Sequence, residues 1–399
     1  MSDDLLTIEQ ALALVLEHAT PLDAEEVALA DAAGRVLAEP ARSAVDLPPF
    51  PSSAMDGFAL RAADTPGTLP VVARIAAGRP APRSLEPGEA MAISTGGVVP
   101  DGADSVVPIE LVEERDEGDT VVITGNVVTA DNVRRRGGDL REGDLVVGAG
   151  IRLGPAHVGA LAASGVTRVH CTRVPRVAIL VTGSELRAPG EQLEPGQIYD
   201  ANGFILAAQL RSTGAEVDRL PPVADDEAAT RAAIERGLAD DVLVTTGGVS
   251  VGVHDLVRAT EAELGVEEIF WRVAMQPGKP VAFGVRGRTL VFGLPGNPVS
   301  SLVGFELFVR PALLALQGLA DPKPRFRPGR LGAPAKRLAA RDALLRARTR
   351  VDGDAVVLDP LSGQQSHMIA QAAAADALVL VPQGEGELAA GSPVSYLQL

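Results

Sequence analysis

Hydrophobic and polar positions at the start of the chain indicate helices followed by a loop. Apolar residues recur at helical spacing over residues 7–19, where Thr7 and Gln10 form a capping box. The stretch "DAAGRVLAEP" predicts a second helix that ends at Pro40. Residues 41–53 carry several prolines and are predicted to form a loop.

The pattern then changes to short apolar runs. Between residues 56 and 150 these runs alternate with clusters of Gly, Pro and Asp, which predicts an antiparallel β module. Helical spacing returns over residues 154–164. Towards the carboxyl end, the Pro- and Arg-rich stretch "DPKPRFRPGR" is typical of a linker. After it, residues 331–399 have short strands and turns that predict a small β-barrel or sandwich.

Residues 175–317 alternate between buried strands and amphipathic helices. The predicted strands are "RVAILVTG", "VDRLPPV", "DVLVTTGG" and "TLVFG", and each is followed by a helical pattern. In the first helix Asn202 is the predicted N-cap and Gly214 the predicted end. This order is typical of a mostly parallel sheet that helices cover on both faces.

Charge and cysteine content narrow the functional classes. The formal charge of −16 argues against nucleic acids and anionic membranes as ligands. The chain has one cysteine, Cys171, and an acidic amino-terminal stretch unlike a signal peptide, which together predict a cytoplasmic protein. No apolar run is predicted to reach membrane-spanning length. The five histidines lack the spacing of zinc ligands.

Three of the predicted strands end in loops that suit an anion. These loops are "VTGSEL", "TTGGVSVGVHD" and "GLPGNPVSS". Their glycines let backbone N–H groups approach a ligand, and the helices that follow add partial positive charge. Because the carboxyl ends of parallel strands meet at one edge of a sheet, the three loops predict a phosphate pocket there. A glycine-rich turn alone can also serve tight packing, and the chain has neither GxGxxG nor GxxxxGK[ST].

Acidic residues cluster beside these loops. Each of them alone is compatible with a helix cap or a solvated turn, and Asp225 or Asp226 can cap the next helix. Several carboxylates near a phosphate favour a bridging Mg²⁺ ion, and the predicted metal ligands are Glu185, Asp225, Asp226 and Asp255. Lys279, in "QPGKP", is a candidate point charge for an oxyanion, or a solvated turn residue.

Taken in order, several stretches resemble the molybdopterin molybdenumtransferase family, which includes the bacterial MoeA proteins and the E domain of gephyrin. The resemblance rests on "PPFPSSAMDGFAL", "ISTGGVVPDGADSVV", "RRRGGDLREGD", "VAILVTGSEL", "IYDANG", "VTTGGVSVGVHD", "MQPGKPVAFG" and "GLPGNPVSS". It covers residues 5 to 320 and is weaker beyond them. Spacing alone did not connect the first three stretches with the pocket, since they have the composition of ordinary β-turns.

The resemblance implies an elongated protomer of four parts and a homodimer. Its fold class is a multidomain α/β plus β protein: a discontinuous helical part (1–45 and 148–174), a β insertion (46–147), a mostly parallel three-layer α/β domain (175–320) that binds molybdopterin, and a carboxyl-terminal β-barrel (328–399). The implied active cleft lies between the α/β domain of one chain and the β insertion of the other.

The resemblance also implies the reaction: Mg²⁺-dependent insertion of molybdate into adenylylated molybdopterin, with release of AMP. The implied catalytic residues are Asp56, Thr95, Asp139, Glu185 and Asp255. The implied substrate-binding residues are Ser94, Thr182, Gly183, Asp200, Gly247, Gly248, Val249, Ser250, Lys279, Pro295, Gly296, Asn297, Pro298, Ser300, Arg341, Arg346 and Ser366.

Two departures and two alternatives accompany this hypothesis. Where many members carry lysines, this chain has Arg272, which keeps the charge, and Gln276, which loses it. One alternative is a gephyrin-like scaffold that binds a partner peptide; a molybdopterin adenylyltransferase is another candidate partner. The second alternative is a nucleotide pyrophosphatase resembling the competence/damage-inducible family, against which the stretch "SSAMDG" argues.

Overall fold

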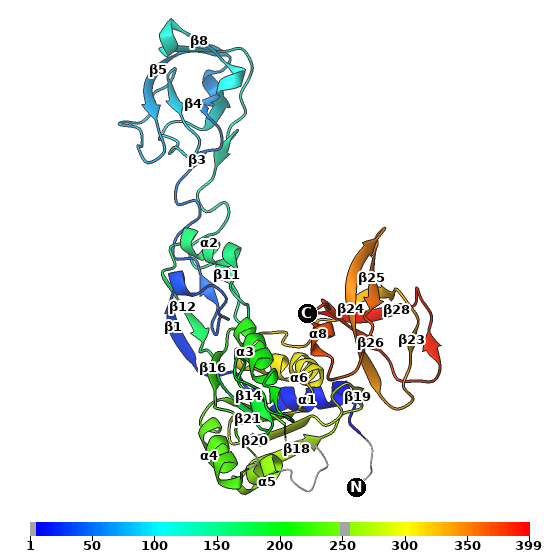
Figure 1. Cartoon of the computed structure of the whole chain (residues 1–399). Coiled ribbons are helices and arrows are strands. Elements are labelled where there is room, and N and C mark those ends of the chain that lie inside the picture. The colour runs from blue at the N-terminus through cyan, green and yellow to red at the C-terminus, as the bar shows by residue number, and fades with distance from the viewer. Residues whose placement is uncertain (1–4, 225, 248–255) are drawn as a thin grey trace. The chain divides into compact units, whose positions relative to one another are not determined.

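The computed structural model describes residues 5–224, 226–247 and 256–399, and the chain divides into two compact units (Figure 1). The first unit comprises Met1–Glu25, Gly34–Ala38 and Cys171–Leu399, and the second comprises Glu26–Ala33 and Glu39–His170.

The second unit is built on a six-stranded sheet with the strand order β7-β4-β6-β5-β9-β8. The predicted antiparallel β module is correct for every pairing except β5 with β6, which run parallel. Phe58, Leu60 and Val107 are among the buried residues that pack on one side of this sheet. The bounds are β4 (Gly57–Leu60), β5 (Gly67–Ile75), β6 (Ala90–Ile93), β7 (Ser105–Pro108), β8 (Glu113–Arg115) and β9 (Thr120–Ile123), with 3-10 turns η2 (Ala62–Asp64), η3 (Ile109–Leu111) and η4 (Asp116–Gly118).

Short strand pairs lead into and out of this sheet. Strand β2 (Ala41–Arg42) pairs with β11 (Leu145–Val147), and β3 (Ser52–Ser53) pairs with β10 (Val133–Arg134). The helix predicted over residues 154–164 is α2 (Pro155–Ala163), which has a proline in its first turn.

The helix predicted in "DAAGRVLAEP" is wrong. The chain there forms the end of a 3-10 turn, η1 (Leu29–Asp31), and then extends. Gly34 has a φ of +80°, which interrupts a right-handed helix, and Leu37 makes an antiparallel bridge with Cys171. Pairing with a distant strand therefore outweighs the helical spacing. The neighbouring strands β1 (Ala24–Ala28) and β12 (Arg168–Thr172) pair with each other.

The first unit contains a six-stranded sheet with the order β16-β13-β17-β21-β20-β18. The pairings among β16, β13, β17 and β21 are parallel, and the pairings that add β20 and β18 are antiparallel. The bounds are β13 (Arg176–Val181), β16 (Glu216–Arg219), β17 (Val242–Thr246), β18 (Glu267–Trp271), β20 (Ala282–Arg286) and β21 (Thr289–Leu294).

Helices cover both faces of this sheet (Figure 1). Side chains of β13 alternate between the two layers, so that Ile179 packs with Leu206 of α3 on one face and Leu180 packs with Ile234 of α4 on the other. Helix α3 ends at Gly214 in the left-handed conformation, as predicted. The bounds are α1 (Ile8–His18), with the predicted capping box of Thr7 and Gln10, α3 (Asn202–Thr213), α4 (Glu227–Gly237) and α5 (Leu256–Glu263).

The last helix that packs against this sheet is long and apolar. It consists of α6 (Pro298–Gly304), the π-helical turn η5 (Phe305–Val309) and α7 (Arg310–Leu316). The prediction that no apolar run is long enough to span a membrane is wrong for length and composition, because Pro298–Leu316 satisfies both. However, 83% of this stretch is buried inside the fold, as expected for a core helix.

The carboxyl-terminal residues form the predicted β-barrel. Five strands close in the order β24-β25-β22-β28-β26, and β26 pairs back onto β24. Leu358, Val379 and Tyr396 are part of its core. The bounds are β22 (Arg327–Leu331), β23 (Ala335–Lys336), β24 (Asp342–Asp352), β25 (Ala355–Pro360), α8 (Ile369–Ala372), β26 (Ala377–Val381), β27 (Glu387–Leu388) and β28 (Pro393–Gln398), and β19 (Met275–Gln276) pairs with β24.

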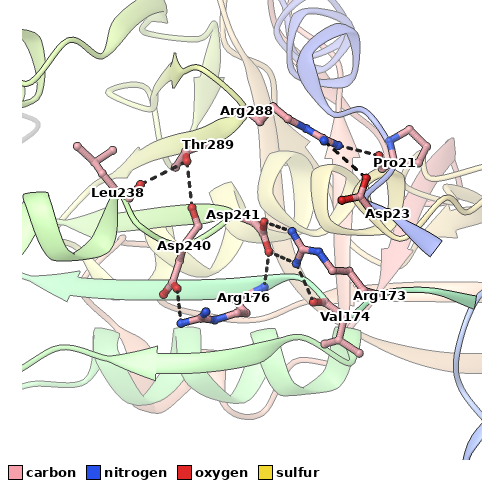
Figure 2. A network of polar contacts seen from close by, with 10 residues as sticks. All are labelled: Pro21, Asp23, Arg173, Val174, Arg176, Leu238, Asp240, Asp241, Arg288 and Thr289. Atoms are coloured by element: carbon pink, nitrogen blue, oxygen red, sulfur yellow. Dashed lines mark hydrogen bonds and ion pairs between the residues drawn. The ribbon is translucent and has the colours of Figure 1, made fainter. Parts of the chain in front are cut away.

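A network of polar contacts joins the amino ends of β13, β17 and β21 (Figure 2). Asp241 accepts two hydrogen bonds from the Arg173 guanidinium, at 2.7 and 2.6 Å, and a third from the backbone N–H of Arg176. Asp240 forms an ion pair with Arg176 at 3.0 Å, and its carbonyl accepts a hydrogen bond from the Thr289 hydroxyl. This network fixes the end of the sheet opposite the predicted pocket.

Candidate functional site

A cavity of about 450 Å³ lies at the carboxyl ends of β13, β17 and β21. It is on the edge of the sheet where open α/β proteins bind ligands. The short parallel strands β14 (Leu186–Arg187) and β15 (Ile198–Tyr199) border it. It is lined by Val181, Thr182, Gly183, Glu185, Leu186, Ile198, Tyr199, Asp200, Ala201, Asn202, Thr246, Gly247, Gly296, Asn297, Pro298, His367 and Ile369.

The first residues of two helices lie at this cavity. Asn202 begins α3, and Pro298 begins the long helix that continues to Leu316. The unpaired N–H groups and the dipole at a helix start favour an anion. Gly183, with a φ of +153°, and Gly247, with a φ of +94°, bring their backbones to the same cavity in conformations that glycine adopts without strain.

Asn202 joins the strand-end loops to one another. Its Nδ2 group donates to the Thr246 hydroxyl and to the Gly296 carbonyl, both at 2.8 Å. Asn202 was predicted to be the N-cap of α3, but the observed N-cap is Ala201, which makes no side-chain capping hydrogen bond. The buried Oδ1 atom of Asn202 has no hydrogen-bond partner among the residues that the structure describes. Since the Gly296 carbonyl can only accept, the orientation of the amide is fixed.

Two buried hydroxyls hold the "GLPGNPVSS" loop. Ser301 donates to the Pro295 carbonyl at 2.9 Å, and its Oγ lies 3.1 Å from the hydroxyl of Thr246. Ser300, the predicted ligand-binding serine, is 4% exposed and does not line the cavity. Thr246, Asn202 and Ser301 were not among the predicted site residues, although all three belong to stretches already singled out in the sequence.

The acidic residues have different surroundings. Glu185 is exposed and lines the cavity. Asp200 also lines it, but is 2% exposed and is held by the Gly203 N–H at 2.8 Å and by Arg219 at 2.6 Å. Asp226 is the N-cap of α4 and accepts from the Ala229 N–H. Among residues 5–224, 226–247 and 256–399, no three His, Cys, Asp or Glu side chains form a metal-binding cluster.

In the second unit, Asp56 and Thr95, two residues that the resemblance implies to be catalytic, form hydrogen bonds with each other. Asp56 Oδ1 accepts from the backbone N–H of Thr95 at 2.7 Å and from its hydroxyl at 3.0 Å. The backbone hydrogen bond, followed by the hydroxyl, lowers the pKa of Asp56. Asp56 and Ser94 line a cavity of about 260 Å³. Asp139 is exposed, and its N–H donates to the Leu47 carbonyl.

The remaining predicted residues that the structure describes do not line the larger cavity. Lys279 is exposed on the turn between β19 and β20, and its carbonyl accepts from the Val273 N–H. Arg341 lies in a turn bridged to Leu338. Arg346, in β24, is 2% exposed, and Ser366 contributes a carbonyl that accepts from the Val299 N–H. Outside the described residues lie the predicted residues Asp225, Gly248, Val249, Ser250 and Asp255.

The sequence matches three family models in order along the chain. Residues 6–165 match the MoeA N-terminal region (domain I and II). Residues 178–315 match the probable molybdopterin binding domain, and all residues lining the larger cavity except His367 and Ile369 lie in this range. Residues 328–399 match the MoeA C-terminal region (domain IV).

Curated relatives and solved structures span nearly the whole chain. A molybdopterin molybdenumtransferase 2 of Mycobacterium tuberculosis is 37% identical and covers 94% of each chain. A molybdopterin molybdenumtransferase of Haemophilus influenzae is 34% identical and covers 98% of each. A molybdopterin biosynthesis MoeA protein of Pyrococcus horikoshii has a TM-score of 0.84 at 33% identity and covers 99% of each.

These comparisons agree with the fold class predicted from the sequence. The match over residues 6–165 argues against the pyrophosphatase alternative. The enzyme names of the relatives favour catalysis over the scaffold alternative. The chain belongs to the molybdopterin molybdenumtransferase (MoeA) family and is an enzyme of molybdenum cofactor biosynthesis.

Proposed function

We propose that this enzyme inserts molybdate into adenylylated molybdopterin, releases AMP and requires Mg²⁺. The observation that carries the proposal is the cavity at the ends of β13, β17 and β21, where two helix starts and two glycine turns meet. Backbone N–H groups in this arrangement bind phosphate oxygens. The pyrophosphate link of the substrate supplies such oxygens, and the pterin occupies the rest of the cavity.

Glu185 fits the role of a magnesium ligand. Mg²⁺ in phosphate-transferring sites is held by one or two carboxylates together with substrate phosphates, so that it does not need a cluster of three protein ligands. Glu185 is exposed at the cavity, whereas Asp200 is already paired with Arg219. When bound, the metal offsets the negative charge that develops as AMP leaves. Asp200 and Arg219 instead fix the turn that precedes α3.

A reconstituted reaction tests this proposal directly. The purified protein is incubated with adenylylated molybdopterin, molybdate and Mg²⁺, and AMP and molybdenum cofactor are measured. We expect both products in equal amounts, and chelation by EDTA should prevent their formation. Absence of AMP with authentic substrate, or undiminished turnover in EDTA, would contradict the proposal.

We also propose that the enzyme works as a cytoplasmic homodimer in which Asp56 of one chain serves the site that contains Glu185 of the other. The support is the family resemblance, which implies a cleft shared between protomers. Mixing Asp56→Ala and Glu185→Gln chains should then recover activity. With equal mixing about half of the dimers contain both chains, and each of these has one intact site of two, so the recovered rate should reach up to about a quarter of the wild-type rate. Each variant alone should stay far below that rate, and failure of the mixture to rise above the two variants would contradict a shared site.

Replacing Gly247 by alanine should weaken substrate binding. A Cβ atom there would lie 2.5 Å from the Thr182 carbonyl oxygen, and the φ of +94° disfavours any L side chain. We expect a strain of about 1–2 kcal/mol and a loop displacement that weakens binding of adenylylated molybdopterin about tenfold or more. Isothermal titration calorimetry measures this loss.

Gly296→Ala is the matched control for the strain. Its Cβ would contact only the Gly247 Cα, at 3.8 Å, within the neighbourhood that the structure describes, and its φ is not positive. We expect the thermal unfolding midpoint of Gly296→Ala to stay close to that of the wild type, whereas that of Gly247→Ala falls. Equal midpoints for the two variants would mean that Gly247 carries no conformational requirement.

A further inference from the structure

The larger cavity has an unusual balance of charge for an anion site. Its acidic lining side chains are Glu185 and Asp200. Asp200 is neutralised by Arg219, whose guanidinium is stacked 4.0 Å from the centre of the Phe204 ring. Among the lining residues that the structure describes, His367 is the only side chain able to carry a positive charge.

His367 is supplied by the carboxyl-terminal barrel rather than by the α/β sheet. It is exposed and lies in the segment of residues 361–368, between β25 and α8. The carbonyl of Ser366, immediately before it, accepts a hydrogen bond of 3.0 Å from the N–H of Val299 in α6. This bond fastens the segment to the start of the helix that borders the cavity.

Arg346 holds the same segment from the barrel side. Its guanidinium donates to the carbonyls of Gly363 at 2.7 Å, Met368 at 3.2 Å and Gln365 at 3.3 Å. These acceptors are neutral, and the buried cation is committed to orienting backbone groups. A side chain so enclosed is a positioning residue for the segment and not a direct ligand.

We propose that His367 binds the phosphate end of the pterin substrate from the barrel side, held in place by Arg346 and the Val299–Ser366 hydrogen bond. This inference rests on the proposed function, because it names a further contact to the same substrate. A protonated imidazole donates a charge-assisted hydrogen bond to a phosphate oxygen, which is stronger than a neutral one. The other titratable side chains that line the described part of the cavity belong to Glu185, Asp200 and Tyr199.

Substrate affinity at two pH values tests this contact. Binding of adenylylated molybdopterin is measured by calorimetry in EDTA without molybdate, so that turnover does not interfere. At about pH 6, where histidines ordinarily carry a proton, His367→Gln should bind about tenfold more weakly than the wild type. At about pH 8 the two proteins should differ less than threefold, because histidines ordinarily carry no proton there. His367→Lys should retain affinity at both pH values.

Matched controls separate the possible failures. Ser362→Ala changes an exposed residue of the same segment that does not line the cavity, and its affinity should equal that of the wild type. If His367→Gln binds like the wild type at both pH values, or loses the same factor at both, the proposed charged contact is overturned. If the wild type itself does not bind the compound, the proposed function fails instead.

Discussion

Glu185→Gln should release AMP about 100-fold more slowly than the wild type, or worse, at saturating substrate and Mg²⁺. Glutamine has nearly the same size, but its neutral amide is a far weaker ligand for Mg²⁺ than a carboxylate. Glu185 is exposed at the cavity, so that the substitution removes charge where the pyrophosphate is expected without disturbing the core. Rapid-quench measurement of AMP formation gives the rate.

Glu194→Gln provides a control for the loss of one charge. Glu194 is exposed, lies nine residues after Glu185 between β14 and β15, and does not line the cavity. Its AMP release should stay within about twofold of the wild type, because an exposed charge at a distance is screened by solvent and salt. Wild-type rates for Glu185→Gln would remove this residue from the magnesium site, and equal losses in both variants would indicate a general effect of charge.

The cavity could be predicted because its main features are local. Each of the stretches "VTGSEL", "TTGG" and "GLPGNP" follows a buried strand, and parallel pairing of β13, β17 and β21 brings their carboxyl ends to one edge. The positive φ angles of Gly183 and Gly247 explain why glycine occurs at those positions. Strand order and glycine placement therefore suffice to locate the cavity.

The contacts between these loops could not be predicted. Asn202 has a favourable sequence position for an N-cap, but its amide bonds instead to Thr246 and Gly296, which lie 44 and 94 residues away along the chain. Propensity describes the local choice, whereas the fold offers partners that a sequence pattern does not reveal. The same competition explains "DAAGRVLAEP", where the bridge from Leu37 to Cys171 replaces helical hydrogen bonds.

The contribution of the barrel was also beyond the sequence pattern. His367 showed no metal-ligand spacing and had no assigned role, and it reaches the cavity because Val299 and Arg346 hold its segment. Strands β18 and β20 were not predicted either, since the turn residues of "QPGKP" dominate the stretch between them. Contacts between separate elements, rather than periodicity, determine both the position of His367 and the formation of β18 and β20.

The network at the amino ends of the strands (Figure 2) predicts opposite effects for two neighbouring acids. Burial alone would raise the pKa of Asp241, but the hydrogen bonds from Arg173 and the Arg176 N–H outweigh it, so that the pKa is lowered. Burial raises the pKa of Asp240, whose partner Arg176 is largely exposed. The charged form of Asp241 therefore stabilises the folded protein, whereas the charged form of Asp240 destabilises it.

Asp241→Asn should lower the free energy of unfolding by about 2–3 kcal/mol at neutral pH, because Arg173 and the Arg176 N–H lose a charged acceptor. Asp240→Asn should be neutral or stabilise by up to about 1 kcal/mol, since it removes a poorly solvated charge and leaves the carbonyl that binds Thr289. Urea unfolding followed by the fluorescence of Trp271, the single tryptophan, reports on the sheet whose strand β17 directly follows both acids.

The pH dependence distinguishes this cause from a loss of packing. A lowered folded-state pKa contributes stability that is complete above the unfolded value of about 3.9 and disappears as the pH falls through the folded value. The cost of Asp241→Asn should therefore begin to shrink below about pH 4, and it should disappear as the pH falls through the lowered folded-state pKa, where the wild-type carboxylate also becomes neutral. For Asp240, whose pKa is raised, the wild type should gain on its Asn variant as the pH falls through that raised pKa. A cost of Asp241→Asn that is independent of pH would show that shape, and not charge, makes this aspartate important.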